Sequence, residues 1–89
     1  MNAYLIIAED NTNLAPMHTL FSSKAKARNF FAKELQDYWP ADQWSDDPAD
    51  SWDANGRTPQ ECIENMTYSD ADNNWLYCIE LEVNSPNWQ

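Results

Sequence analysis

The residues best suited to chemistry lie together in one stretch, 38–53, which reads YWPADQWSDDPADSWD. It contains five aspartates, three tryptophans and no basic residue. The aspartates are Asp42, Asp46, Asp47, Asp50 and Asp53, and the tryptophans are Trp39, Trp44 and Trp52. A solvated linker would not carry three indoles, and a core would not carry five unpaired carboxylates. The combination predicts a negatively charged surface with apolar anchors.

Carboxylates at this spacing can imitate the phosphates of a nucleic acid. Duplex DNA carries one negative charge per about 1.7 Å of helix axis, counting both strands. Four aspartates recur every three or four residues, so that even a partly helical segment would align them: Asp42, Asp46, Asp50 and Asp53. The sequence therefore favours a surface that occupies a groove in which another protein holds DNA with Lys and Arg.

Two tryptophans and three further acids would complete this surface. Trp44 and Trp52 would be the desolvated anchors that dominate protein interfaces. Asp47 would extend the patch within the segment, and Glu61 and Glu64 would extend it from the next helix. The alternative is that the tryptophans cover the back of a helix and that the aspartates are only their solvated neighbours.

The charge balance limits the class of partner. The 89 residues include 15 acids and 5 bases, a formal net charge of −10. Such a field repels nucleic acid and anionic membranes and attracts basic protein surfaces. We therefore expect neither a nucleic acid nor a membrane as a direct partner. The alternative is that the acidity only keeps a small protein in solution.

Four of the five basic residues lie within ten positions on one predicted helix: Lys24, Lys26, Arg28 and Lys33. By themselves they would suggest nucleic-acid binding. A molecule with a net charge of −10 would, however, approach a polyanion only at a large electrostatic cost. We expect these bases to compensate the acidic segment within the molecule.

The patterns for catalysis and metal binding are weak. His18 is the only histidine, and as a general base it would need a nucleophile such as Cys62 or Cys78. The single glycine, Gly56, cannot form a phosphate-binding loop. Residues 70–74 fit the first ligand positions of a calcium loop, but a tryptophan replaces the required glycine and a leucine the final glutamate. The sequence predicts no enzyme, no cofactor and no specific metal site.

Length and hydropathy predict a single domain over residues 1–89. A hydrophobic content of 43%, including 13% aromatic residues, argues against disorder. The chain does not begin with a secretory leader, in which basic residues precede an apolar stretch, and it contains no apolar run of about 18 residues. These two features predict a soluble cytoplasmic protein. Cys62 and Cys78 could pair, but two cysteines are too few for a disulfide framework, so reduced core thiols are expected.

Local patterns predict the order β, β, α, α, β. Strands are expected at residues 3–8, 17–21 and 75–83, and helices at residues 24–39 and 59–66. Residues 40–57, between the helices, would form an irregular acidic and tryptophan-rich segment, because prolines at 40 and 48 exclude one regular helix. Residues 68–74 are expected to be a loop, and residues 84–89 a frayed tail.

The helix ends are the clearest local signals. Ser22 and Ser23 can cap the first helix, and Pro40 ends it. Thr58 and Glu61 form the pattern of a capping box, and Gly56 marks a turn. The first helix would bury a stripe at helical spacing: Ala27, Phe30, Phe31, Leu35 and Tyr38.

The last strand predicts how the sheet packs. Its glutamates, Glu80 and Glu82, would point away from the core. Its large apolar residues would face the core: Trp75, Tyr77, Ile79, Leu81 and Val83. The simplest packing is a two-layer α+β fold, in which a three-stranded antiparallel sheet has its last strand beside its first and one long helix across one face.

The organisation resembles a known class of protein. A start reading MNAYLII, a serine-capped helix rich in alanine over residues 23–35, an acidic middle and a final strand ending in IELEV are similar to the small acidic anti-CRISPR proteins of phages and mobile elements. DNA-mimic anti-restriction proteins have the same general features. The basic start of the helix departs from pure DNA mimicry.

The resemblance implies a non-enzymatic inhibitor in the cytoplasm of a bacterial host. Its partner would be a basic nucleic-acid-binding protein, either a CRISPR effector complex or the nuclease of one. The inhibitor would block target-DNA recognition by occupying the DNA-binding groove. The alternative is a small structural or adaptor protein that meets a folded partner through a sheet edge or a tryptophan patch.

Overall fold

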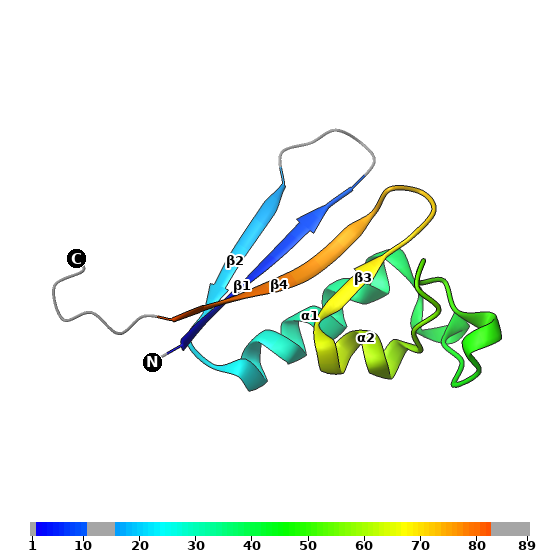
Figure 1. The fold of residues 1–89 in the computed structure, drawn as a ribbon, viewed down its shortest axis with the longest axis horizontal. Coiled ribbons are helices and arrows are strands. Elements are labelled where there is room, and N and C mark those ends of the chain that lie inside the picture. Colours follow the sequence, from blue (N-terminus) through cyan, green and yellow to red (C-terminus); the bar gives the residue numbers. More distant parts are fainter. Residues whose placement is uncertain (1, 11–15, 83–89) are drawn as a thin grey trace, which may run out of the picture.

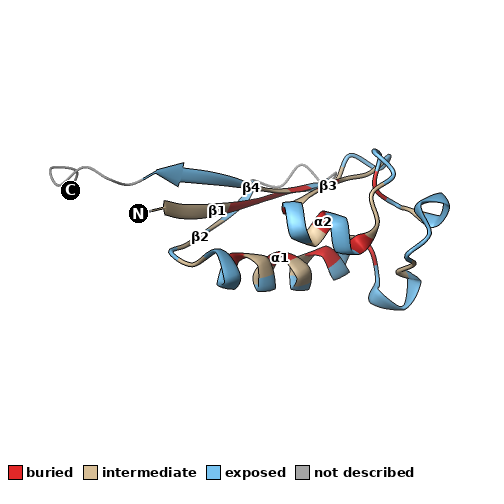
Figure 2. Cartoon of the chain, turned by 60° about the horizontal axis from the view of Figure 1, so that its bottom comes forward, coloured by how far each residue is buried: buried red, intermediate tan, exposed pale blue. Residues whose placement is uncertain are grey.

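Four antiparallel strands form one sheet, and two helices lie against one of its faces (Figures 1 and 2). The computed structural model describes residues 2–10 and 16–82, so the predicted tail at 84–89 lies outside the described residues. The elements are β1 Asn2–Glu9, β2 Met17–Phe21, α1 Lys24–Tyr38, η1 Ala41–Gln43, η2 Pro48–Asp50, α2 Pro59–Asn65, β3 Thr67–Ser69 and β4 Trp75–Glu82. The predicted α+β class is confirmed, and β4 lies beside β1 as expected.

The sheet has one more strand than predicted. Its order is β2-β1-β4-β3, and β3 occupies part of the stretch for which we predicted a loop. Tyr68 of β3 pairs with Leu76, and the backbone N–H of Cys78 donates to the carbonyl of Met66. A strand of three residues is too short to show alternation in sequence, which explains why the pattern missed it. The predicted long helix packs on the sheet as α1, and α2 lies on the same face in addition to it (Figure 2).

The predicted helix ends are confirmed. The Ser23 hydroxyl accepts from the backbone N–H of Lys26, and α1 ends before Pro40. At the start of α2, the Thr58 hydroxyl accepts from the N–H of Glu61 at 3.2 Å, and the Glu61 carboxylate accepts from the N–H of Thr58 at 3.1 Å. This reciprocal pair is the predicted capping box. Gly56 has φ of +74°, as a turn glycine can adopt without strain.

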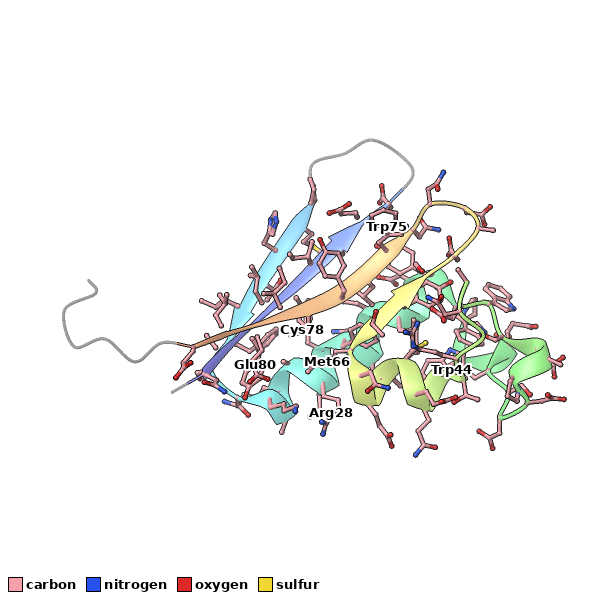
Figure 3. The ribbon with its side chains drawn as sticks, in the orientation of Figure 1. Arg28, Trp44, Met66, Trp75, Cys78 and Glu80 are labelled. Atoms are coloured by element: carbon pink, nitrogen blue, oxygen red, sulfur yellow. The ribbon has the colours of Figure 1, made fainter. Side chains whose placement is uncertain are left out.

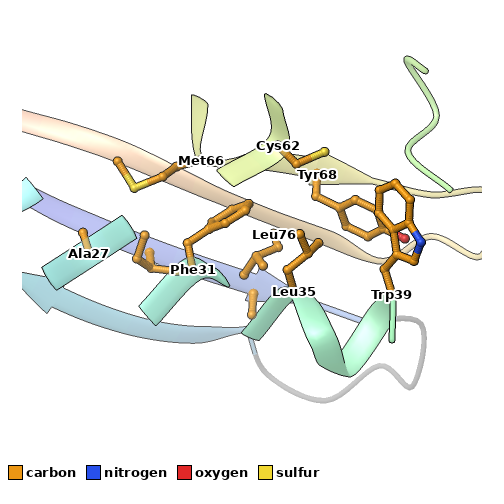
Figure 4. Close-up of a cluster of buried hydrophobic side chains, with 10 residues drawn as sticks. Ala27, Phe31, Leu35, Trp39, Cys62, Met66, Tyr68 and Leu76 are labelled. Atoms are coloured by element: carbon orange, nitrogen blue, oxygen red, sulfur yellow. The ribbon is translucent and has the colours of Figure 1, made fainter. Parts of the chain in front are cut away.

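The core lies between α1, α2 and the covered face of the sheet (Figure 4). The predicted stripe of α1 is present, with Ala27, Phe31 and Leu35 fully buried and Phe30 and Tyr38 packed against them. The other buried members come from the sheet, from α2 and from the residues that follow the two helices: Ile6, Ala8, Trp39, Cys62, Met66, Tyr68 and Leu76.

The predicted orientation of β4 was wrong, and Val83, which we also predicted to face the core, lies outside the described residues. Leu76 is fully buried under the helices, whereas Trp75, Ile79 and Leu81 are 40–48% exposed on the other side of the sheet. The pairing of Leu76 with Tyr68, and of Cys78 with Ile6, determines this orientation. Glu80 also points to the helix side, where its carboxylate accepts from the side-chain amide of Asn2 at 2.8 Å. The helices cover only the first half of β4, so Glu80 stays in water on that side.

Candidate acidic binding site

Two short 3₁₀ turns present the predicted acidic segment at one end of the molecule, drawn in green at the right of Figure 1. Asp47 caps the second turn, because its carboxylate accepts from the N–H of Ala49 at 2.9 Å. The Ser45 hydroxyl accepts from the N–H of Asp47 and donates to the Asp50 carboxylate, both at 3.1 Å. The side chains themselves therefore order this segment, which sequence patterns left irregular.

Four of the predicted carboxylates are exposed on these turns: Asp42, Asp46, Asp47 and Asp50. We refer to these four residues as the acidic end. None of them forms an ion pair with a basic residue in the described part of the chain. The structure therefore gathers these four predicted site residues on one segment with their charges unpaired.

The tryptophans attach the acidic end to the core. Trp39 is fully buried, and its ring nitrogen donates to the carbonyl of Gln43 at 3.3 Å. The ring nitrogen of Trp44 donates back to the carbonyl of Trp39 at 2.7 Å. The rings of Trp39 and Trp52 stack at 6.2 Å and 7°. Trp44 is thus partly an internal anchor, whereas Trp52 remains 44% exposed beside the acidic end.

Asp53 does not belong to the exposed surface, which corrects our prediction for this residue. Its carboxylate is buried and pairs with the Arg57 guanidinium at 3.2 Å. It also accepts from the backbone N–H groups of Asn55, Arg57 and Ser69. The bond to Ser69 ties the end of the acidic segment to β3. The sequence alone does not distinguish this structural role from a surface role, because either one is compatible with an aspartate three residues before a turn glycine.

The two glutamates of α2 extend the site in different ways. Glu64 lines an open groove of about 490 Å³ between α2 and the acidic segment. Glu61 is exposed, but its carboxylate serves the capping box. The other residues of the groove are Trp44, Ser45, Asp46, Pro59, Gln60 and Ile63 (Trp44 is labelled in Figure 3). Sequence reasoning did not identify Pro59, Gln60 and Ile63 as site residues, because only the fold of the segment onto α2 brings them beside Trp44.

Within the described residues, none of the four basic residues of α1, Lys33 included, forms an ion pair with the acidic end, contrary to our prediction that they compensate it. Lys24, Lys26 and Arg28 lie in the first turns of α1, and the acidic turns follow its other end (Figure 1). A helix of 15 residues is about 22 Å long. Lys24, at its start, is therefore farther from the acidic turns at its end than the Debye length of about 10 Å, so salt largely screens the attraction between them. The first turn of α1 lies near other acids instead, because Lys24 lines one pocket together with Glu64 and Glu80.

The candidate catalytic residues are not brought together. His18 pairs with Ile7 on the side of the sheet without helices, whereas Cys78 pairs with Ile6 on the covered side. Cys62 is buried in the core, and both cysteines are free thiols. The sheet thus separates the imidazole from either sulfur.

The stretch with a partial calcium-loop pattern is a turn held by its own side chains. The Asp70 carboxylate accepts from the backbone N–H groups of Asp72 and Asn74, from the Asn74 amide and from the Tyr68 hydroxyl. These donors use the oxygens that a calcium ion would require. Within residues 2–10 and 16–82, no group of three or more His, Cys, Asp or Glu side chains could hold a metal ion.

We predict that Cys62 resists alkylation in the folded protein. Burial, reinforced by Asp53, raises the pKa of Cys62 from 9.0 to about 12, so at about pH 8 roughly one thiol in 10⁴ is ionised. Because the thiolate is the reactive form, iodoacetamide should modify Cys62 at least about 100-fold more slowly in the native protein than in urea. Peptide mass spectrometry of timed samples measures both rates. Equal rates in the two states would contradict the buried position of this thiol.

No helix in the described part of the chain is both long enough and apolar enough to cross a membrane. The acidic end, with its four exposed carboxylates and the adjoining groove, is the strongest candidate site in the described part of the chain. No protein-family model, no curated protein and no solved structure is significantly similar to this chain.

Proposed function

We propose that the protein is a non-enzymatic inhibitor that binds a basic, nucleic-acid-binding groove of another protein through its acidic end. The observation that carries this proposal is the exposure of four carboxylates on one ordered segment with no ion pair to the described bases. A partner that holds phosphates with Lys and Arg offers the complementary charge. Among such partners, the resemblance to anti-CRISPR proteins points to a CRISPR effector complex.

The fixed conformation of the acidic segment supports this role. An acidic loop that had to be ordered on binding would lose much of its interaction energy to conformational entropy. Here the tryptophan anchors and the Ser45 contacts already hold the carboxylates in place. The charges are thus preorganised for a partner whose own charges are fixed on a groove.

The groove beside Trp44 suits a cationic side chain of the partner. Trp44, Pro59 and Ile63 offer apolar surface for an alkyl stem, and the indole face attracts a guanidinium or ammonium group. Asp46 and Glu64 lie on the same groove and supply the negative charge. One Arg or Lys entering this groove would place the remaining bases of the partner near the acidic end.

The triple variant Asp46→Asn, Asp47→Asn, Asp50→Asn tests this proposal. Because each substitution removes a charge and keeps the side-chain shape, we expect the dissociation constant for a CRISPR effector to rise at least about 100-fold. Biolayer interferometry against a panel of purified effectors measures it. Wild-type binding should weaken steeply with salt and compete with excess target duplex.

A matched control separates local from overall charge. The variant Asp72→Asn, Glu80→Gln, Glu82→Gln also removes three negative charges, but from residues outside the acidic end. It should bind within about threefold of the wild type, since long-range charge affects mainly the association rate. If the triple Asn variant binds as tightly as the wild type, the proposal fails.

A second candidate function, an adaptor that meets a folded partner through a tryptophan patch, has one observation in its favour. Trp52 is 44% exposed although its ring stacks on a buried indole. In that case Trp52→Ala would abolish binding and salt would barely weaken it. The salt titration therefore distinguishes the two functions.

A further inference from the structure

The side of the sheet opposite the helices, which we call the open face, is apolar. The pairing register places large apolar residues of β1, β2 and β4 on this face: Leu5, Ile7, Leu20, Trp75, Ile79 and Leu81. Figure 2 shows both helices on the other side of the sheet. No described element covers the open face.

These side chains form one patch rather than scattered exceptions. Leu20 is 62% exposed, and Trp75, Ile79 and Leu81 are 40–48% exposed. Ile7 is only 6% exposed, although it lies outside the core cluster, so its neighbours on the open face already surround it. Single exposed apolar residues are normal on a monomer, whereas a contiguous patch marks an interaction surface.

The open face is almost free of charge in a very acidic protein. Of the 15 acids, the strand register places only Glu9 on this face, where its carboxylate accepts from the Tyr77 hydroxyl at 3.3 Å. A basic partner would be attracted to the acidic end instead. The open face therefore fits a partner surface that is itself neutral and apolar.

We propose that this partner is a second copy of the chain, and that two open faces stack sheet on sheet. A second copy offers an identical face, as an isologous dimer requires, and brings almost no acids into the interface. The four strands contain 24 residues in all, which cover about 380 Å² at standard strand spacing. Two such faces together bury about 760 Å², the size of a weak interface, so we expect a dimer that forms only at high protein concentration.

Salt should affect this dimer and the acidic end in opposite directions. Each copy carries a net charge of −10, so repulsion between copies opposes association and added salt relieves it. Binding of the acidic end to a basic partner weakens with salt instead. The dimer proposal therefore stands or fails independently of the proposed function.

Sedimentation equilibrium of the full chain over a range of concentrations tests the dimer. We expect the mass to rise from the 10.4 kDa of one chain to twice this value, at lower concentrations when the salt is higher. Ile79→Lys should raise the dimer dissociation constant at least about 100-fold, because the symmetric interface would bury the new charge twice. A thermal melt followed by circular dichroism shows that the variant is folded.

The strand β2 offers a matched pair of control variants. Leu20→Lys changes the open face and should weaken the dimer, whereas Met17→Lys changes a residue that is 47% exposed on the helix side and should not. Equal effects of these two variants would overturn the proposal. So would a folded Ile79→Lys protein that dimerises like the wild type, or a wild type that stays monomeric at every concentration. If the full chain stays monomeric but a chain ending at Glu82 dimerises, the open face binds residues 83–89 of its own chain rather than a second copy.

Discussion

Asp53→Ala is expected to destabilise the folded protein by about 3–5 kcal/mol, although four other aspartates of the same segment are exposed. The substitution removes the buried carboxylate that pairs with the half-buried Arg57 guanidinium at 3.2 Å. It also removes the acceptor for three backbone N–H groups, including that of Ser69 in β3. Each donor left unsatisfied away from water costs about 1–3 kcal/mol. Urea denaturation followed by tryptophan fluorescence measures the free energy of unfolding.

Asp46→Ala is the matched control for Asp53. The Asp46 side chain is exposed, and no hydrogen bond to it is found in the described part of the chain, so its loss should change the stability by less than about 0.5 kcal/mol. Asp53→Asn should fall between the two, since its amide oxygen can still accept from one N–H while its NH₂ group meets donors. A loss below about 1 kcal/mol for Asp53→Ala would show that the carboxylate is not the link between the acidic segment and β3.

Trp39→Ala should cost about 3–5 kcal/mol, a large part of the roughly 5–13 kcal/mol that a domain of this size has in total. Trp39 is fully buried, stacks on Trp52 and lies 6.1 Å from the Tyr68 ring between centroids. Its loss removes core volume and the indole against which the acidic segment is held. We therefore expect the variant to lose order in residues 40–52 before the rest of the chain unfolds.

Hydrogen exchange and urea denaturation together test this order of events. Amides of residues 40–52 should exchange much faster in Trp39→Ala, while those of β1 and β4 keep most of their protection. Trp75→Ala is the matched control when both variants are measured at a protein concentration at which the chain is monomeric, because Trp75 is 48% exposed there and its loss should cost less than about 1 kcal/mol. If both tryptophan variants lose equal stability, the acidic end is not anchored through Trp39.

The features that sequence predicted well depend on local physics. Ser23, the capping pair of Thr58 and Glu61, and Pro40 act within one helical turn, so their effect is visible without knowledge of the fold. The stripe of α1 was also predictable, because one helix face with Phe31 and Leu35 has only one way to be buried. Exposure of the acidic end followed from the cost of burying unpaired carboxylates.

The features that sequence could not predict depend on neighbours far along the chain. In β4 both sides carry apolar residues, so alternation alone could not decide whether Leu76 or Trp75 faces the core. The register with β1 and the short β3 decided it. In the same way, Asp53 and its exposed neighbours are chemically identical, and only the arrival of β3 turned one of them into a buried structural acid.

The amino-acid sequence by itself determined the helix boundaries, the α+β class and the presence of an exposed acidic segment, because these follow from contacts within a few residues. Only the tertiary structure decided which acids remain free, that the groove beside Trp44 exists and that the apolar side of β4 faces outward. The reason is that a strand side chain alternates between two faces with no local preference for either. Long-range pairing and the limited area of two short helices select the face that is buried.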